Sequence, residues 1–255
     1  MLTLVGIGHV FSIRDAIKQI IFEKKPDIVC VELDKLRFEN LERGQRGSED
    51  LPFIFKRLQR IYEKAAETQG ANVGEEMIAA VEAAKEMDIP HEFIDVEATP
   101  LVGNLLENLS IGQKTKLMGS VLMASVLPKK NLEEGIKMIE DDPEQAIEQF
   151  ERAFPTLKRD IVDYRDKYMS ERIVEITENF SNVIVIAGEG HIPGLTRYLG
   201  DLDIEVIHLK QVMELAEKLR SGSVKMATLP KPGKKEEKTN SSVTFTFEIE
   251  SNDLV

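Results

Sequence analysis

The amino-acid sequence predicts an α/β fold with a central, mostly parallel sheet, β-α-β units at both ends of the chain and a large helical insertion in the middle. Two observations lead to this prediction. Short apolar runs without polar alternation recur near both ends, which is typical of strands that are covered on both faces. Apolar residues at helical spacing follow these runs and dominate the middle of the 255-residue chain.

The first β-α-β unit lies at the start of the chain. Leu2 to Gly6 and Asp27 to Leu33 have the pattern of buried strands, and Ile13 to Glu23 has helical spacing between them. Ser12 stands where an N-cap belongs. Because a helix joins the two strands, we expect them to be parallel members of one sheet.

The second unit lies nearer the other end. Asn182 to Ala187 predicts a strand, a helix begins at about Pro193, and Ile204 to Leu209 predicts the next strand. Gln211 to Leu219 has the spacing of a closing helix. Between the two units, His91 to Asp95 is a further expected strand.

The helical insertion spans about residues 38–180 of a domain that we place at residues 1–220. Its helical segments are expected at Leu51–Thr68, Gly74–Met87, Ser110–Leu127, Leu132–Glu140, Pro143–Phe150 and Leu157–Phe180.

The C-terminal part has a different composition. Residues 221–242 are rich in Lys, Pro, Gly and Ser and predict a flexible linker. Residues 243–255 form a tail in which Val243 to Ile249 alternates as a strand does. Such a strand needs a sheet edge, and we expect it to add to a second copy of the chain in a homodimer, with docking on its own subunit as the alternative.

Composition excludes several classes of protein. The chain has 33 basic and 45 acidic residues, a formal net charge of −12, which argues against a nucleic-acid partner. One cysteine excludes an intramolecular disulfide and a Cys-rich zinc site, and it favours a cytoplasmic protein. No apolar stretch approaches the roughly 18 residues that span a bilayer, and no secretory leader pattern is present, so no membrane partner is expected.

Two glycine corners share one pattern. Residues 6–9 read Gly-Ile-Gly-His and residues 188–191 read Gly-Glu-Gly-His, each directly after a predicted strand. We expect the glycines to let the backbone turn sharply and to present His9 and His191 at helix entrances. Ligand sites of open α/β sheets lie at such strand ends. The alternatives are incidental histidines or a truncated dinucleotide motif, which the missing third glycine disfavours.

Glu32 closes the second predicted strand after four apolar residues, where an unpaired carboxylate would be costly to bury. His9, Glu32 and His191 together make a candidate set of ligands for a divalent metal ion. Arg37 follows on the next turn and is suited to hold an anionic group or an oxyanion. The alternative for Arg37 is a solvated ion pair with Asp34 at the start of a helix.

Other polar residues carry weaker signals. Glu75 and Glu76 stand at a helix start, where acidic residues are common. Arg165 and Asp166 lie on the long helix, where most charges form a solvated face. Three further residues are interpreted as structural: His91, His208 and Cys30.

Five motifs occur in a fixed order: GIGH at 6–9, PDIVCVELDKLR at 26–37, GEEM at 74–77, FPTLKRDIVDYRDKYM at 154–169 and AGEGHIPGL at 187–195. In this order, over about residues 1–200, they resemble the TraB/PrgY/GumN family. That family is similar in turn to the Tiki metalloproteases and, more remotely, to erythromycin esterases and ChaN-like haem-binding proteins.

The resemblance implies a site built from His9, His191 and Glu32 in an α/β core with a helical insertion. In the Tiki branch this set is associated with metal-dependent peptide cleavage. Three further residues fall on polar motif positions of the family: Arg37, Glu76 and Arg165.

The chain also departs from the family pattern. Asp95 is followed by Val96 instead of Arg, and Tyr164 replaces Glu before Arg165. Many members carry C-terminal membrane helices, whereas this sequence has the Lys-rich linker and the alternating tail there.

The leading hypothesis is therefore a metal-dependent hydrolase that cleaves peptides, with Mn, Co or Zn as the ion. Its expected metal ligands are His9, Glu32 and His191. The general base is expected to be Glu189 or Glu76. The oxyanion is expected to be stabilised by Arg37 or Arg165. The alternative is a non-catalytic protein that sequesters a peptide or small ligand in the same pocket. The missing Asp-Arg and Glu-Arg pairs favour the alternative, whereas the histidine pair and Glu32 favour the enzyme.

Overall fold

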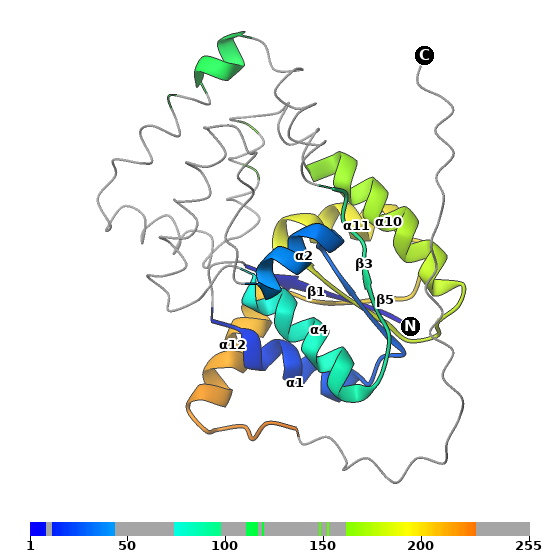
Figure 1. Cartoon of the computed structure of the whole chain (residues 1–255), viewed down its shortest axis with the longest axis vertical. Coiled ribbons are helices and arrows are strands. Elements are labelled where there is room, and N and C mark those ends of the chain that lie inside the picture. The colour runs from blue at the N-terminus through cyan, green and yellow to red at the C-terminus, as the bar shows by residue number, and fades with distance from the viewer. Residues whose placement is uncertain are drawn as a thin grey trace.

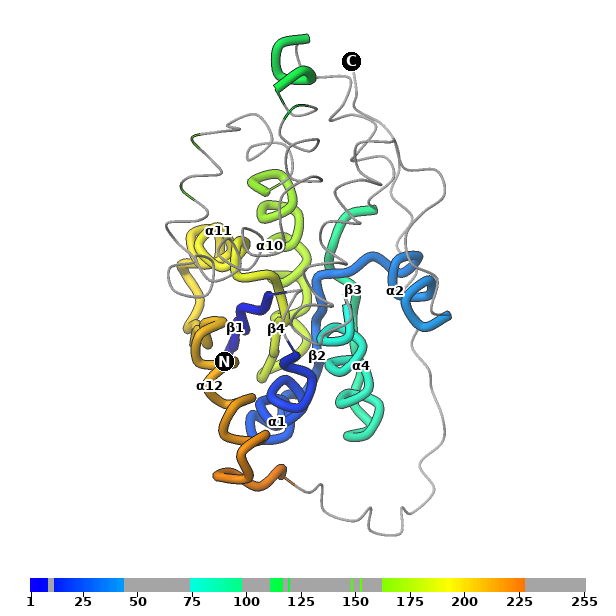
Figure 2. Tube along the Cα trace, turned by 90° about the vertical axis from the view of Figure 1, so that its left-hand side faces the viewer, coloured from blue at the N-terminus to red at the C-terminus, as the bar shows by residue number. Residues whose placement is uncertain are grey.

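The computed structural model of the chain describes residues 1–8, 12–43, 74–97, 111–116, 119, 148, 152 and 162–227. Its described strands form one parallel sheet in the order β3-β2-β4-β1-β5, and Figure 2 shows the first four of these strands side by side. The strands are β1 (Leu2–Ile7), β2 (Ile28–Val31), β3 (His91–Phe93), β4 (Val183–Gly188) and β5 (Ile204–Ile207). The predicted α/β class and all five predicted strands are confirmed.

Helices cover both faces of this sheet (Figure 1). The helical elements are α1 (Arg14–Lys24), α2 (Lys35–Glu42), α4 (Glu75–Met87), α10 (Tyr164–Thr177), η2 (Glu189–His191, a 3-10 turn), α11 (Ile192–Tyr198) and α12 (Leu209–Arg220). The helices α1, α4 and α12 pack on one face, and α10 and α11 pack on the other. The sheet is therefore the middle layer of three.

The strands of the two β-α-β units interleave. β4 lies between β1 and β2, and β1 lies between β4 and β5. In the register of the ladder, Ile7 of β1 pairs with Gly188 of β4, and Val31 of β2 pairs with Ile186. The two glycine corners consequently leave the sheet from neighbouring strands, at its carboxyl edge.

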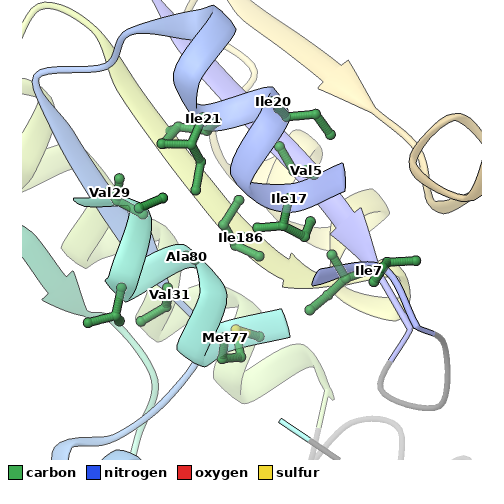
Figure 3. Packing of buried hydrophobic residues seen from close by; sticks show 14 of the residues in the cluster. Val5, Ile7, Ile17, Ile20, Ile21, Val29, Val31, Met77, Ala80 and Ile186 are labelled. Carbon is green, nitrogen blue, oxygen red and sulfur yellow. The ribbon is translucent and has the colours of Figure 1, made fainter. Parts of the chain in front are cut away.

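Alternation along the central strands separates two apolar cores. On the first face, Ile186 points toward Ile17 of α1 and Met77 of α4 (Figure 3). On the second face, Val185 packs with Met169 and Ile173 of α10. Since successive side chains of a strand point to opposite faces, β4 is buried along its whole length, which explains its continuous apolar sequence.

Local chemistry sets where the helices begin and end. α1 begins after Ile13 without a side-chain cap, so the prediction of Ser12 as N-cap is wrong. α2 has the capping that its sequence suggests, because the Asp34 side chain accepts a hydrogen bond from the backbone N–H of Arg37 at 2.9 Å. α4 ends at Asp88, which adopts the left-handed conformation (φ 58°).

Several predictions fall on residues that are not described. They include the helices at 51–68 and 132–140 and the strand at 243–249 with its expected homodimer, which stays a prediction. Residues 221–227 of the expected linker follow α12, and the N–H of Ala227 donates to Gln19 of α1 at 2.6 Å. Among the described helices, none combines the length and apolar character needed to cross a bilayer.

The central strand provides a test of this packing. We expect Ile186→Ala to lower the free energy of unfolding by about 2–5 kcal/mol, because it removes methyl groups from a buried layer and leaves a cavity. Val174→Ala on the exposed side of α10 is the matched control and should change the free energy by less than about 0.5 kcal/mol. Urea unfolding of both variants measures the difference, and equal effects would contradict the assigned layers.

Candidate functional site

The carboxylate of Glu32 lies at the carboxyl edge of the sheet, directly after β2. The ladder between β2 and β4 continues into this residue, because the Glu32 N–H donates to the Ile186 carbonyl at 3.0 Å. One carboxylate oxygen, Oε2, accepts the backbone N–H of Gly188 at 2.6 Å. Strand pairing therefore fixes both the backbone and the side chain of Glu32, which is only 4% exposed.

His191 lies opposite Glu32, on the 3-10 turn that follows β4. Its Nε2 is 3.1 Å from Glu32 Oε1, and its Nδ1 is 2.5 Å from Asp166 Oδ1 on α10. The imidazole is thus held between two carboxylates that are far apart in the sequence. Hydrogen bonds at both ring nitrogens fix its orientation.

Arg165, the residue before Asp166, binds Glu32 and one further carboxylate, that of Asp95. Its Nε and Nη2 donate to the two oxygens of Asp95 at 2.8 and 2.7 Å, and Nη2 also donates to Glu32 Oε1. This fork geometry is the strongest way in which arginine binds a carboxylate. Arg165 therefore ties Asp95, just beyond β3, to Glu32, just beyond β2.

Arg37 completes the cluster at its outer side. Its Nη1 donates to Asp95 Oδ2 at 3.1 Å, and 43% of its side chain is exposed. Asp34 beside it is buried, and its Oδ2 lies 4.0 Å from Arg37 Nε without a hydrogen-bond partner among the described residues. Asp95, although followed by Val96, thus receives two arginines that are distant in sequence.

Burial and charge oppose one another in this cluster. Burial lowers the pKa of His191, but the negative charge of Glu32 and the hydrogen bonds to Asp166 and Glu32 outweigh it and raise the pKa to about 9. Burial raises the pKa of Asp166, although its bond to His191 opposes this. For Arg165, the charges of Glu32 and Asp95 outweigh burial and raise the pKa above its ordinary value.

The described contacts of Glu189, a predicted general base, are with the start of α12 and not with the cluster around Glu32. Its Oε1 accepts from His208 Nδ1 and its Oε2 from the N–H of Leu209, both at 2.8 Å. His208 stands at the N-cap of α12 and not inside β5, where its sequence pattern placed it. The described contacts thus connect Glu189 to the start of α12, whereas those of His191 lead to Glu32 and Asp166.

Two other predicted residues can be placed only in part. Glu76 lies on the first turn of α4, the helix start that its sequence predicted, and is 2% exposed. His9 is not among the described residues. Within the described residues, no group of three or more His, Cys, Asp or Glu side chains is arranged to hold a metal ion. The structure brings together Glu32, His191, Arg165 and, through Asp95, Arg37.

Asp166 and the role of Asp95 were not predicted from the sequence. Asp166 was interpreted as part of a solvated face, yet it is 1% exposed. A signal was present, because Asp166 stands at helical spacing from Met169, Ile173 and Ile176 on the buried face of α10. Asp95 follows β3 as Glu32 follows β2, so its position in the sequence already placed a second carboxylate at the carboxyl edge of the sheet.

The corner glycines do not act as the sequence suggested. Gly188 has a φ of −56°, which any residue adopts, and Gly6 continues β1 without a left-handed φ. Among the described glycines, a positive φ occurs at Gly74 and Gly222. The chain does turn directly after β4, into the 3-10 turn that carries His191, but without a left-handed glycine, and at Gly6 the reason for a glycine lies in the space around it.

Comparisons with known proteins agree with these observations. The sequence profile of the TraB/PrgY/gumN family matches residues 2–206, which include every described residue of the cluster. The chain is also 28% identical over 237 residues to an uncharacterized protein of Methanocaldococcus jannaschii. That alignment covers 85% of this chain and 59% of the relative, so the chain spans less than two thirds of the relative's length.

The raised pKa of His191 predicts how stability depends on pH. Because the pKa is about 9 in the folded protein and about 6.5 when unfolded, this group stabilises the fold fully below pH 6.5. That contribution, roughly 3 kcal/mol, is lost as the pH rises through 9. Urea unfolding of chelator-treated protein between pH 6 and 10 measures it. We expect a smaller decline in His191→Gln, and equal declines in both proteins would contradict the assignment.

Proposed function

Because the chain belongs to the TraB/PrgY/gumN family, we propose that it is a divalent-metal-dependent hydrolase whose substrates are peptides. The observation that supports this most is the line of three side chains from Asp166 through His191 to Glu32. The peptide class rests on the resemblance to the Tiki metalloproteases. The dependence on a metal ion and the peptide substrate can be tested separately.

Two described residues fit as ligands of one ion. His191 Nε2 and Glu32 Oε1 are 3.1 Å apart, and two ligand atoms that are each about 2.1 Å from one ion lie roughly 3 to 3.5 Å from one another. The other ring nitrogen, Nδ1, is bound by the carboxylate of Asp166. A carboxylate is a usual partner for the second ring nitrogen of a metal-bound histidine. The proposed third ligand is His9. A nitrogen-and-carboxylate set of this kind suits Zn, Mn or Co.

A bound ion of this kind would supply a polarised carbonyl and a water of lowered pKa. Two arginines of the chain would orient the carboxylates and contact the substrate. Arg165 is 13% exposed and donates to both Glu32 and Asp95, so it orients these carboxylates. Arg37 is far more exposed at the edge of the cluster, and we assign to it the contact with the developing oxyanion of the substrate.

The general base is assigned to Glu76 rather than Glu189. α4 precedes a parallel strand, so it runs opposite to the strands, and its first turn lies at the carboxyl edge of the sheet. Glu76 belongs to that turn. The described contacts of Glu189 lead to the start of α12 and not to Glu32 or His191, which makes it less suited to take a proton from a water held there.

One observation favours a second candidate, a protein that binds a peptide or small ligand without cleaving it. Every cationic group of the described cluster is paired inside it: Arg165 and Arg37 with Asp95, and His191 with Asp166. A closed set of ion pairs gives a rigid binding surface without requiring a reactive group. Turnover distinguishes the two candidates.

The proposed location is the cytoplasm. Cys30 is the single cysteine of the sequence and is fully buried. Burial raises the pKa of its thiol, so it lacks the features of a redox-active cysteine. A chain without disulfides fits a reducing compartment.

A peptide library tests the proposed function. We expect the purified protein to cleave a subset of peptides with Mn²⁺, Co²⁺ or Zn²⁺, and mass spectrometry of the products to show roughly 100-fold less cleavage after chelation. His9→Ala and His191→Ala should have the same effect. His91→Ala, at the opposite edge of the sheet, is the matched control and should retain cleavage.

The same assay separates the alternatives. Cleavage that survives both chelation and His191→Ala would contradict a metal site at Glu32 and His191. Tight peptide binding without products would favour the sequestering protein. Glu76→Gln should lower turnover about 100-fold or more, whereas Glu75→Gln, on the same turn but half-exposed, should not.

A further inference from the structure

We propose that Gly194 is a positioning residue for His191, because its missing side chain leaves the space in which the Asp166 carboxylate lies. This inference adds a residue to the site of the proposed function, but its geometric part stands on the contacts of Asp166 alone. Gly194 is on α11, three residues after His191.

The distances leave no room for a side chain at this position. A methyl carbon built on Gly194 would lie 1.8 Å from Asp166 Oδ2, 2.5 Å from Cγ and 3.0 Å from Cβ. Contacts below about 3.0 Å are not tolerated between such atoms, so the carboxylate would have to move. Asp166 is 1% exposed and its other oxygen is bonded to His191, so the shift that relieves the clash displaces the carboxylate that orients the imidazole.

The backbone gives no other reason for a glycine here. Gly194 is helical and has no positive φ, so an L-residue could adopt its conformation. Glycine is also the poorest helix former after proline. A glycine inside a seven-residue helix therefore reflects packing, and the atoms that occupy its free space belong to the partner of His191.

A second carboxylate repeats this arrangement on the other side of the turn. A methyl carbon on Gly6 would lie 1.8 Å from Glu189 Oε2, which accepts the N–H of Leu209. On both sides of the turn that carries His191, an acidic side chain therefore lies against a glycine: Asp166 against Gly194, and Glu189 against Gly6. Asp166 orients the imidazole, and Glu189 connects the turn to α12.

Gly194→Ala tests the proposal, with Gly200→Ala as the matched control. A methyl carbon on Gly200 would lie 3.5 Å from the Thr196 carbonyl oxygen, an ordinary contact. NMR of protein labelled in the histidine rings reports the hydrogen-bonded Nδ1 proton of His191 without any need for activity. We expect this signal to be lost or strongly shifted in Gly194→Ala and unchanged in Gly200→Ala. Mn²⁺ affinity should fall about 10- to 100-fold in Gly194→Ala only.

A double variant keeps the test decisive if Gly194→Ala does not fold. Asp166→Ala with Gly194→Ala removes the clashing carboxylate, so the double variant should unfold at a higher urea concentration than Gly194→Ala alone. A folded Gly194→Ala with an unchanged His191 signal would overturn the proposal, and so would a double variant that is no more stable than the single one. If wild-type protein binds no Mn²⁺ and cleaves no peptide but the NMR result holds, the proposed function fails and this inference stands.

Discussion

The carboxylate of Glu32 is the group on which the rest of the site depends. It is buried at the end of β2, and a buried carboxylate is tolerated only with partners that compensate for lost solvation. Its described partners come from three places: the Gly188 N–H at the end of β4, His191 on the following turn, and Arg165 on α10. Satisfying one side chain therefore fixes the relative positions of β2, β4 and a helix on the far face of the sheet.

The interleaved strand order makes this arrangement possible. Since β4 lies between β1 and β2, the corner after β4 is next to Glu32 on one side and next to the end of β1 on the other. α10 then contributes two consecutive residues with different tasks, because Arg165 binds the carboxylates and Asp166 binds the imidazole. The structure thus joins Glu32 of the first β-α-β unit and His191 of the second through one helix of the insertion.

Sequence reasoning found the strands, Glu32 and His191 because their signals are local, and it named Arg37 and Arg165 as polar motif positions of the family. Glu32 interrupts an apolar run, and His191 follows a repeated glycine pattern. Asp95 and Asp166 were missed because their partners are 70 and 25 residues away in sequence, at Arg165 and His191. Most charged residues on helices are solvated. For Asp166, only its helical spacing from buried apolar residues indicates that it is buried instead. The glycine contacts were beyond prediction, since they depend on which side chain fills a space between packed elements.

The proposed metal site requires Glu32 and His191 to hold one ion between them. Anomalous diffraction from crystals of the full chain soaked in Mn²⁺ tests this most directly, with Glu32→Gln crystals treated identically as the reference. We expect an anomalous peak within about 2.3 Å of both His191 Nε2 and Glu32 Oε1, and we expect this peak to be lost in Glu32→Gln. A map without a peak there, in which the two atoms remain hydrogen-bonded at 3.1 Å, would contradict it.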